Sequence, residues 1–199
     1  MEVMSENVYL RLLGVHKMDY IDIKYNAIGV IKSQICSAIV NSESVRKALD
    51  FKGSNCEDYD PDDPFTLIHN CVIPWFQHPD TITTTEPLVF VSVKTSENAR
   101  NPYLLNATAT IICSVDKDDM RTTAGYFRED LLENGCICYT RADWIADEVI
   151  KCISELQGTW IGDIDVIEST EYAMSNTRYA RSLGFRLKDV NIGKLIQNG

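Results

Sequence analysis

The chain has 199 residues, a mass of 22.5 kDa, 45% apolar residues, a formal net charge of -10 and a pI of about 4.7. This length predicts one domain with a sizeable core, and no apolar run approaches the roughly 18 residues that span a bilayer. The acidic balance argues against a general nucleic-acid binder, because phosphate binding needs clustered lysines and arginines.

The N-terminal sequence lacks the pattern of a secretion signal, which is a basic region, a long apolar run and a small-residue cleavage site. We therefore expect a protein of the cytoplasm. The seven cysteines agree with this, because their number is odd and some lie within apolar runs, as Cys113 and Cys152 do. We expect reduced, mostly buried thiols that pack as small apolar side chains.

Helical spacing dominates the first part of the chain and predicts a helix from Asn26 to Val40. The apolar positions that define its buried face are Ile28, Ile31, Ile35, Ile39 and Val40. A second, short helix is predicted from Ser42 to Leu49, with Ser42 as its N-cap. Residues 51–70 follow, and their Gly, Asn, Asp and Pro content predicts a long loop.

Two antiparallel hairpins are predicted in the rest of the chain. Alternation and β-branched residues mark strands at Leu88 to Val93 and Ala107 to Val115, joined by the short, turn-rich SENARNPY. Asp163 to Glu171 and Arg178 to Val190 form a second strand pair around a turn at Ser175 and Asn176.

The stretch from Thr140 to Gly158 predicts an amphipathic helix between the hairpins. Thr140 can cap its N-terminus, Asp143 can complete a capping box, and Gly158 is a stop signal. Its apolar stripe consists of Ile145, Val149, Cys152, Ile153 and Leu156. Each charge in this helix has a local structural explanation, which favours a structural role over catalysis.

Residues 117–134 leave two alternatives open, a helix ended by Gly135 or a long excursion. The order of elements is helix, hairpin, helix, hairpin. This predicts an α+β fold with helices packed on one face of a largely antiparallel sheet. We expect a single domain over residues 1–199, with long loops near 51–70 and 117–139.

Metal-binding patterns in the sequence are weak. Four candidate zinc ligands lack the paired, short spacing of structural zinc sites; they are Cys56, His69, Cys71 and His78. Cys136 and Cys138 have one residue between them rather than two. Residues 57–64 are acidic but lack the Gly and distal Glu of a calcium loop, so we expect a solvated acidic loop that could dock on a basic partner. No metal and no cofactor are expected.

Enzymatic motifs are also weak. The sequence has no G-x-x-x-x-G-K-[ST], G-x-G-x-x-G or G-x-S-x-G motif. Asp22-Ile23-Lys24 is similar to half of a metal-dependent nuclease site, but a matching upstream acid is hard to place. We predict that the protein is not an enzyme. The alternatives are a small cytoplasmic enzyme with a Cys/His or carboxylate site between Cys56 and His78, and a monomeric adaptor that uses the acidic loop.

The aromatic residues Trp75, Phe76, Trp144, Trp160 and Tyr172 are predicted mainly as core residues. Trp75 and Phe76 adjoin a turn-rich loop, however, and could instead anchor a contact between subunits.

The segment RADWIADEVI, residues 141–150, resembles a helix of the tail-terminator and tail-completion proteins of long-tailed bacteriophages. The segment YARSLGFRLKD, from Tyr179 to Asp189, is similar to the closing strand of that family, and the likeness extends from Leu88 onward. The resemblance implies a structural ring protein of the virion, expected as a hexamer, that caps the tail tube and joins it to the head. The loop from Asp58 to Asp63 and the excursion from Lys117 to Gly135 are longer than this role needs, so a neck or head–tail connector role stays open.

The implied partners are other copies of the chain, the tail tube protein and a neck or connector protein, with no membrane. The expected location is the virion, and the host cytoplasm during assembly. Six copies would carry a charge of about -60, and an acidic lumen would let DNA pass without sequence-specific binding.

Charged, turn-rich segments are the expected contacts between subunits, because long polar loops commonly reach the neighbours in a ring. The predicted interface residues are Asp58, Asp60, Asp62, Asp63, Arg121, Arg128, Arg141, Asp143, Arg178, Arg181 and Arg186.

Overall fold

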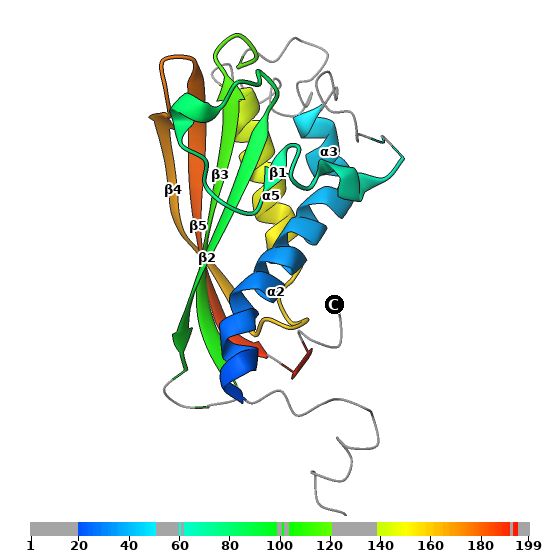
Figure 1. Cartoon of the computed structure of the whole chain (residues 1–199), viewed down its shortest axis with the longest axis vertical. Helices are drawn as coiled ribbons and strands as arrows, with labels where there is room; N and C mark the ends of the chain where they lie inside the picture. Colours follow the sequence, from blue (N-terminus) through cyan, green and yellow to red (C-terminus); the bar gives the residue numbers. More distant parts are fainter. Residues whose placement is uncertain are drawn as a thin grey trace, which may run out of the picture.

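A five-stranded sheet with the strand order β1-β2-β3-β5-β4 organises the computed structural model, and the helices α2 and α5 lie on one side of it (Figure 1). The structure describes residues 20–50, 60, 62–98, 101, 104–120, 139–191, 193 and 194. Its helices are α2 (Tyr20–Asn41), α3 (Glu43–Leu49) and α5 (Arg141–Ser154), with short 3-10 helices η1 (Pro64–Leu67) and η2 (Pro79–Thr81). Its strands are β1 (Val72–Ile73), β2 (Leu88–Glu97), β3 (Leu104–Asp116), β4 (Asp163–Ala173) and β5 (Arg178–Asn191).

The structure confirms the three helices that the sequence pattern predicts. α2 begins six residues earlier than expected, at Tyr20 rather than Asn26. The Ser42 hydroxyl accepts a hydrogen bond from the Val45 amide and caps α3 as predicted. The predicted capping box of α5 is also present. The Asp143 amide donates to the Thr140 hydroxyl at 3.3 Å, and the Thr140 amide donates to the Asp143 carboxylate at 2.9 Å.

Both predicted hairpins are antiparallel, and each of their strands is longer than the sequence pattern indicates. Two further pairings were not predicted. β3 pairs antiparallel with β5 from Leu104 opposite Asn191 to Asp116 opposite Arg178, and this joins the two hairpins into one sheet. The two-residue β1 pairs parallel with β2. The predicted α+β fold with a largely antiparallel sheet is confirmed.

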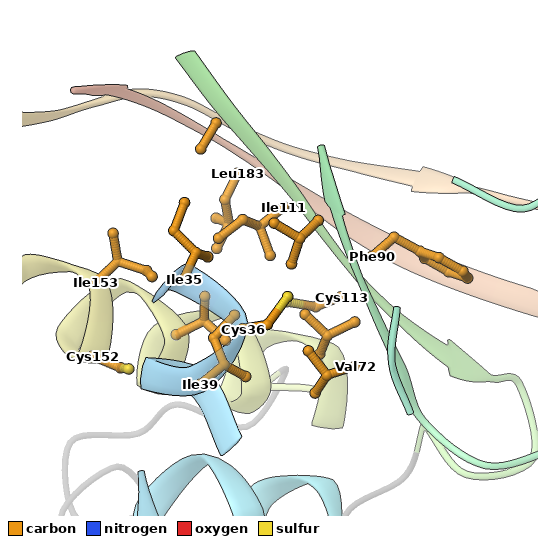
Figure 2. Close-up of a cluster of buried hydrophobic side chains, with 14 of the residues drawn as sticks. Ile35, Cys36, Ile39, Val72, Phe90, Ile111, Cys113, Cys152, Ile153 and Leu183 are labelled. Atoms are coloured by element: carbon orange, nitrogen blue, oxygen red, sulfur yellow. The ribbon is translucent and has the colours of Figure 1, made fainter. Parts of the chain in front are cut away.

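The main core lies between the helices and the sheet. Figure 2 shows Ile35 and Ile39 of α2 and Ile153 of α5 facing Ile111 and Leu183 of the sheet. These side chains are fully buried. Burial of apolar surface contributes roughly 25 cal/mol per Å², so this layer supplies the main driving force that holds the helices on the sheet.

The described residues cover the opposite face of the sheet only in part. Phe90 points away from the helices (Figure 2) and is nevertheless fully buried. It lies opposite Ile112 in the register. The chain before β2 provides cover near this position, since Thr84 and Glu86 contact Arg178 on the same face.

Trp144 and Trp160 are core residues, as predicted. The core prediction is wrong for Trp75, Phe76 and Tyr172, whose side chains are exposed. Trp75 and Phe76 follow the two-residue strand β1, at the point where the chain turns from the core to the surface. Tyr172 lies on the edge strand β4.

Four cysteines are free and buried, as predicted; they are Cys36, Cys71, Cys113 and Cys152. Cys56, Cys136 and Cys138 lie outside the described residues. Among the helices that the structure describes, none is long and apolar enough to cross a membrane.

We predict that these buried thiols are unreactive in the folded protein. Burial raises the pKa of Cys36 and Cys152 to about 11 and that of Cys113 to about 12, so few thiolates are present at neutral pH. Iodoacetamide labelling mapped peptide by peptide should leave them unmodified in buffer and modify them fully in guanidinium chloride. Equal labelling rates for Cys113 under the two conditions would show that the packing is wrong.

Candidate functional site

Within the described residues, a group of charged side chains gathers where the N-terminal half of α5 packs against β5, next to β4. We call it the Arg181 cluster; its members are Tyr139, Asp143, Asp147, Glu171 and Arg181. The register places Glu171 of β4 opposite Arg181 of β5 on the helix-covered face. The Arg181 guanidinium lies 3.0 Å from the Asp143 carboxylate and 3.3 Å from that of Asp147. The Tyr139 hydroxyl donates to Asp147 at 2.8 Å.

Two of the three carboxyl groups in this cluster, those of Asp143 and Glu171, have pKa values that their surroundings shift in opposite directions. Burial by itself raises the pKa of Asp143, but hydrogen bonds from Thr140 and with Glu171, together with the charge of Arg181, lower it below its usual value. The hydrogen bond to Asp143 and its negative charge raise the pKa of Glu171. As the pH falls, Glu171 therefore becomes protonated before Asp143 does. The cluster connects α5 to the sheet by ion pairs and contains one carboxyl group, Glu171, whose pKa is raised.

Arg141, at the start of α5, joins this helix to α3. Its guanidinium donates to the carbonyl of Ala48 at 3.2 Å and to that of Leu49, the last residues of α3, and it lies 3.1 Å from the Asp119 carboxylate. The last carbonyls of a helix have no partner within the helix and attract positive charge. Arg141 therefore supplies hydrogen-bond donors and positive charge to the C-terminal carbonyls of α3.

Arg178 is enclosed on the other face of the sheet, with 2% of its surface exposed. It donates to the Ser114 hydroxyl at 3.0 Å and to the Ser114 carbonyl at 3.1 Å, and it reaches the carbonyls of Thr84 at 2.7 Å and Glu86 at 2.8 Å. Burial lowers the pKa of Arg178, and the negative charge of Asp116 opposes that effect. Its hydrogen bonds hold Thr84 and Glu86, which precede β2, against the sheet.

Four of the residues predicted at subunit contacts thus use their polar groups within the chain. They are Arg141, Asp143, Arg178 and Arg181, and their partners lie as far as 94 residues away in the sequence. Other predicted interface residues are exposed, namely Asp60, Asp62, Asp63 and Arg186. The remaining three, Asp58, Arg121 and Arg128, lie outside the described residues.

The candidate zinc ligands do not form a site within the described residues, where no group of three possible metal ligands occurs. Cys71 is buried, whereas His69 and His78 are exposed. His69 stacks on Trp75 with ring centres 5.4 Å apart, and His78 caps η2 by accepting from the Asp80 amide.

Exposed aromatic and acidic side chains flank β1. We call this the aromatic–acidic surface; its residues are Asp60, Asp62, Asp63, Phe65, Trp75 and Phe76. The exposed fractions are 51% for Phe65, 44% for Trp75 and 47% for Phe76. No sequence pattern singled out Phe65, which lies within the predicted loop of residues 51–70.

Local hydrogen bonds hold the aromatic–acidic surface in place. Asp63 caps η1 by accepting from the Phe65 amide at 2.9 Å, and the Thr66 hydroxyl donates to the carbonyls of Asp60 and Asp63. Lys32 of α2 donates to the carbonyl of Pro74 at 2.9 Å, next to Trp75. The aromatic rings are therefore presented to solvent by ordered backbone, as in preformed contact surfaces.

The sheet face opposite the helices carries exposed basic residues. Lys94 of β2, Thr108 of β3 and Arg186 of β5 lie side by side across the sheet in the register, and Asp165 of β4 follows Arg186. Lys94 and Arg186 are exposed. We call this pair the basic row. The chain thus has an acidic and a basic surface at different places.

A comparison with protein families finds that the YomW family model matches residues 42–188. This range covers α3 to β5, that is, most of the chain and nearly the whole sheet. YomW is a family of the Bacillus phage and prophage type, which points to a phage origin. A comparison with curated proteins gives no match.

We predict that replacing Arg178 by Met destabilises the protein by about 3 kcal/mol, because three carbonyls and a hydroxyl would lose their buried donor. The matched control is Arg186→Met on the same strand, which should change stability by less than about 0.5 kcal/mol because its side chain is exposed. Urea unfolding followed by circular dichroism measures both. Equal losses in the two variants would contradict the role assigned to Arg178.

The Arg181 cluster predicts a specific pH dependence. The raised pKa of Glu171 means that its ionisation opposes folding above that pKa, so Glu171→Gln should be more stable than the wild type at pH 7, by roughly a few tenths of a kcal/mol after solvent screening. The gain should shrink once the pH falls below the folded pKa of Glu171 and should vanish below its usual pKa of 4.5, where the wild-type carboxyl group is neutral in both the folded and the unfolded protein.

Asp143→Asn is the matched comparison and should have the opposite sign. The lowered pKa of Asp143 contributes stability above its usual value of 3.8, and this contribution is lost as the pH falls through the lower folded value. The variant should lose about 1 kcal/mol at pH 7 and progressively less in acid. Urea midpoints measured between pH 3 and pH 7 test both variants, and parallel curves for all three proteins would contradict the coupling.

Proposed function

We propose that this chain, which belongs to the YomW family, is a structural virion protein that forms a ring at the head–tail junction of a phage or prophage and terminates the tail tube. The family supports a phage-associated protein. The ring and the position at the tail end are inferred from the surface of the chain and from its resemblance to tail-terminator proteins.

The observation that carries the proposal is the presence of two complementary surfaces on one chain. Head-to-tail contacts in a ring join two different patches of the same protein. The aromatic–acidic surface supplies large aromatic side chains and negative charge, and the basic row supplies Lys94 and Arg186. Aromatic residues commonly anchor interfaces, while charge complementarity fixes the orientation of the partners.

The net charge of -10 agrees with a channel for DNA. Acidic residues that remain on the inner wall would repel the phosphate backbone and keep DNA from adhering. The same surface properties also suit a neck or connector ring, which differs in the neighbour that it contacts rather than in the contact between its own subunits.

Charge reversal tests the ring contact. Asp62→Lys makes the acidic surface more basic, and Arg186→Glu makes the basic row more acidic, so each variant alone should fail to form the oligomer of the wild type. In an equal mixture, each modified patch meets a complementary patch on the other variant. The mixture should therefore form an even-numbered ring with alternating subunits.

Light scattering gives the mass of each sample, and electron microscopy with purified tail tubes shows whether rings sit at one tube end. Lys47→Glu on the exposed face of α3 serves as a matched control and should assemble normally. A wild-type chain that stays monomeric with and without tubes would overturn the proposal. Rings that bind only to the neck would replace the terminator role by the connector role.

A further inference from the structure

Within the described residues, no strand pairs with the outer edge of β4. Among the strands that the structure describes, β4 pairs with β5 alone and ends the sheet (Figure 1). It has 11 residues, against two in β1 at the other edge. Alternate residues of an antiparallel strand direct their N–H and C=O groups away from the paired neighbour. A free edge of this kind is a template for another strand.

The side chains of β4 are suited to an apolar partner. Val166 is 46% exposed and Ile167 is 44% exposed. Ile167 is the extra residue of a bulge between Val166 and Glu168. Gly184 of β5 lies opposite this bulge, and a Cβ atom there would be 3.2 Å from the Ile167 side chain. The glycine therefore gives Ile167 the room that it needs at the edge.

The charge of β4 selects against pairing with another β4. The strand carries only acidic charged side chains, Asp163, Asp165, Glu168 and Glu171. Two copies side by side would bring these carboxylates together, and like charges in opposed strands are destabilising. A partner strand should therefore be apolar and basic.

The sequence holds one segment of this chemistry outside the described residues. Residues 8–17 read VYLRLLGVHK, with Arg11, His16 and Lys17 and without an acidic residue. The segment has ten residues, which nearly matches the length of β4. Its valine, tyrosine and leucine content is compatible with a strand.

The connection of this segment to α2 favours a neighbouring copy over its own chain. Only Met18 and Asp19 separate it from Tyr20, the first residue of α2, and two residues span about 7 Å. α2 packs against β1 and β2, and β2 lies three strand positions from β4, a separation of about 14 Å.

We infer that residues 8–17 of one copy add to β4 of the next copy as a sixth strand of its sheet. This inference rests on the homo-oligomer of the proposed function and specifies a second contact within it. Backbone hydrogen bonds would supply affinity, while a basic residue facing Glu168 would set the register.

Hydrogen–deuterium exchange of the full chain tests the inference. The amides of β4 should become more protected as the protein concentration rises, whereas those of the central β3 should not change. Deletion of residues 1–17 should remove the protection of β4, and a synthetic peptide of residues 6–18 should restore it. If deletion does not change exchange in β4, the inference is wrong. Protection that needs residues 1–17 but does not depend on concentration would indicate pairing within one chain and would also overturn it.

A charge variant keeps the test valid if the deletion disturbs folding. In the full chain, Arg11→Glu should raise the protein concentration at which β4 becomes protected roughly tenfold, whereas the conservative Arg11→Lys should leave it nearly unchanged. Equal concentration dependence in all three proteins would contradict the predicted contact with the acidic strand.

This outcome is separable from that of the proposed function. Protection of β4 in a protein that does not bind tail tubes would overturn the tail-terminator role and support the strand contact. Rings on tubes formed equally well by the deleted chain would support the terminator role and overturn the strand contact.

Discussion

The antiparallel pairing of β3 with β5 is the constraint on which the rest of the structure depends. Each hairpin forms from strands that are near in sequence, but only this pairing joins them into one sheet with one apolar face for the helices. It also places Arg181 opposite Cys113 on the helix-covered face and Arg178 opposite Asp116 on the other. A slip of one residue would exchange the two faces, so the register is fixed both by burial and by these two arginines.

Three arginines connect elements that strand pairing does not join, through side-chain hydrogen bonds and ion pairs. Arg141 joins α5 to α3, Arg181 joins α5 to β4 and β5, and Arg178 holds the chain before β2 on the far face. The planar guanidinium can serve several acceptors at once, which a lysine cannot do with the same geometry. These three positive charges are therefore used in contacts within the chain.

Three exposed surfaces of the described part of the chain are chemically distinct from one another. The aromatic–acidic surface near β1, the basic row on the sheet face opposite the helices and the acidic edge of β4 differ in charge and in shape. A protein that contacts copies of itself head to tail needs unlike surfaces of this kind. The bulge and the carboxylates of β4 also protect the edge from indiscriminate pairing, so an open edge can be kept for a partner of opposite charge.

The sequence by itself determined the local elements: the spacing of Ile31, Ile35 and Ile39 predicted α2, and Thr140 with Asp143 predicted the capping box of α5. These features depend on interactions between residues a few positions apart in the sequence, so a sequence pattern is sufficient to predict them. The sequence also indicated the phage context, through the likeness of the α5 and β5 segments. Only the tertiary structure decided that Arg178 is enclosed and that Trp75 is exposed, because their surroundings come from residues distant in the chain. The same holds for the edge position of β4, since strand order depends on which hairpin strands meet, and no short-range pattern records that choice.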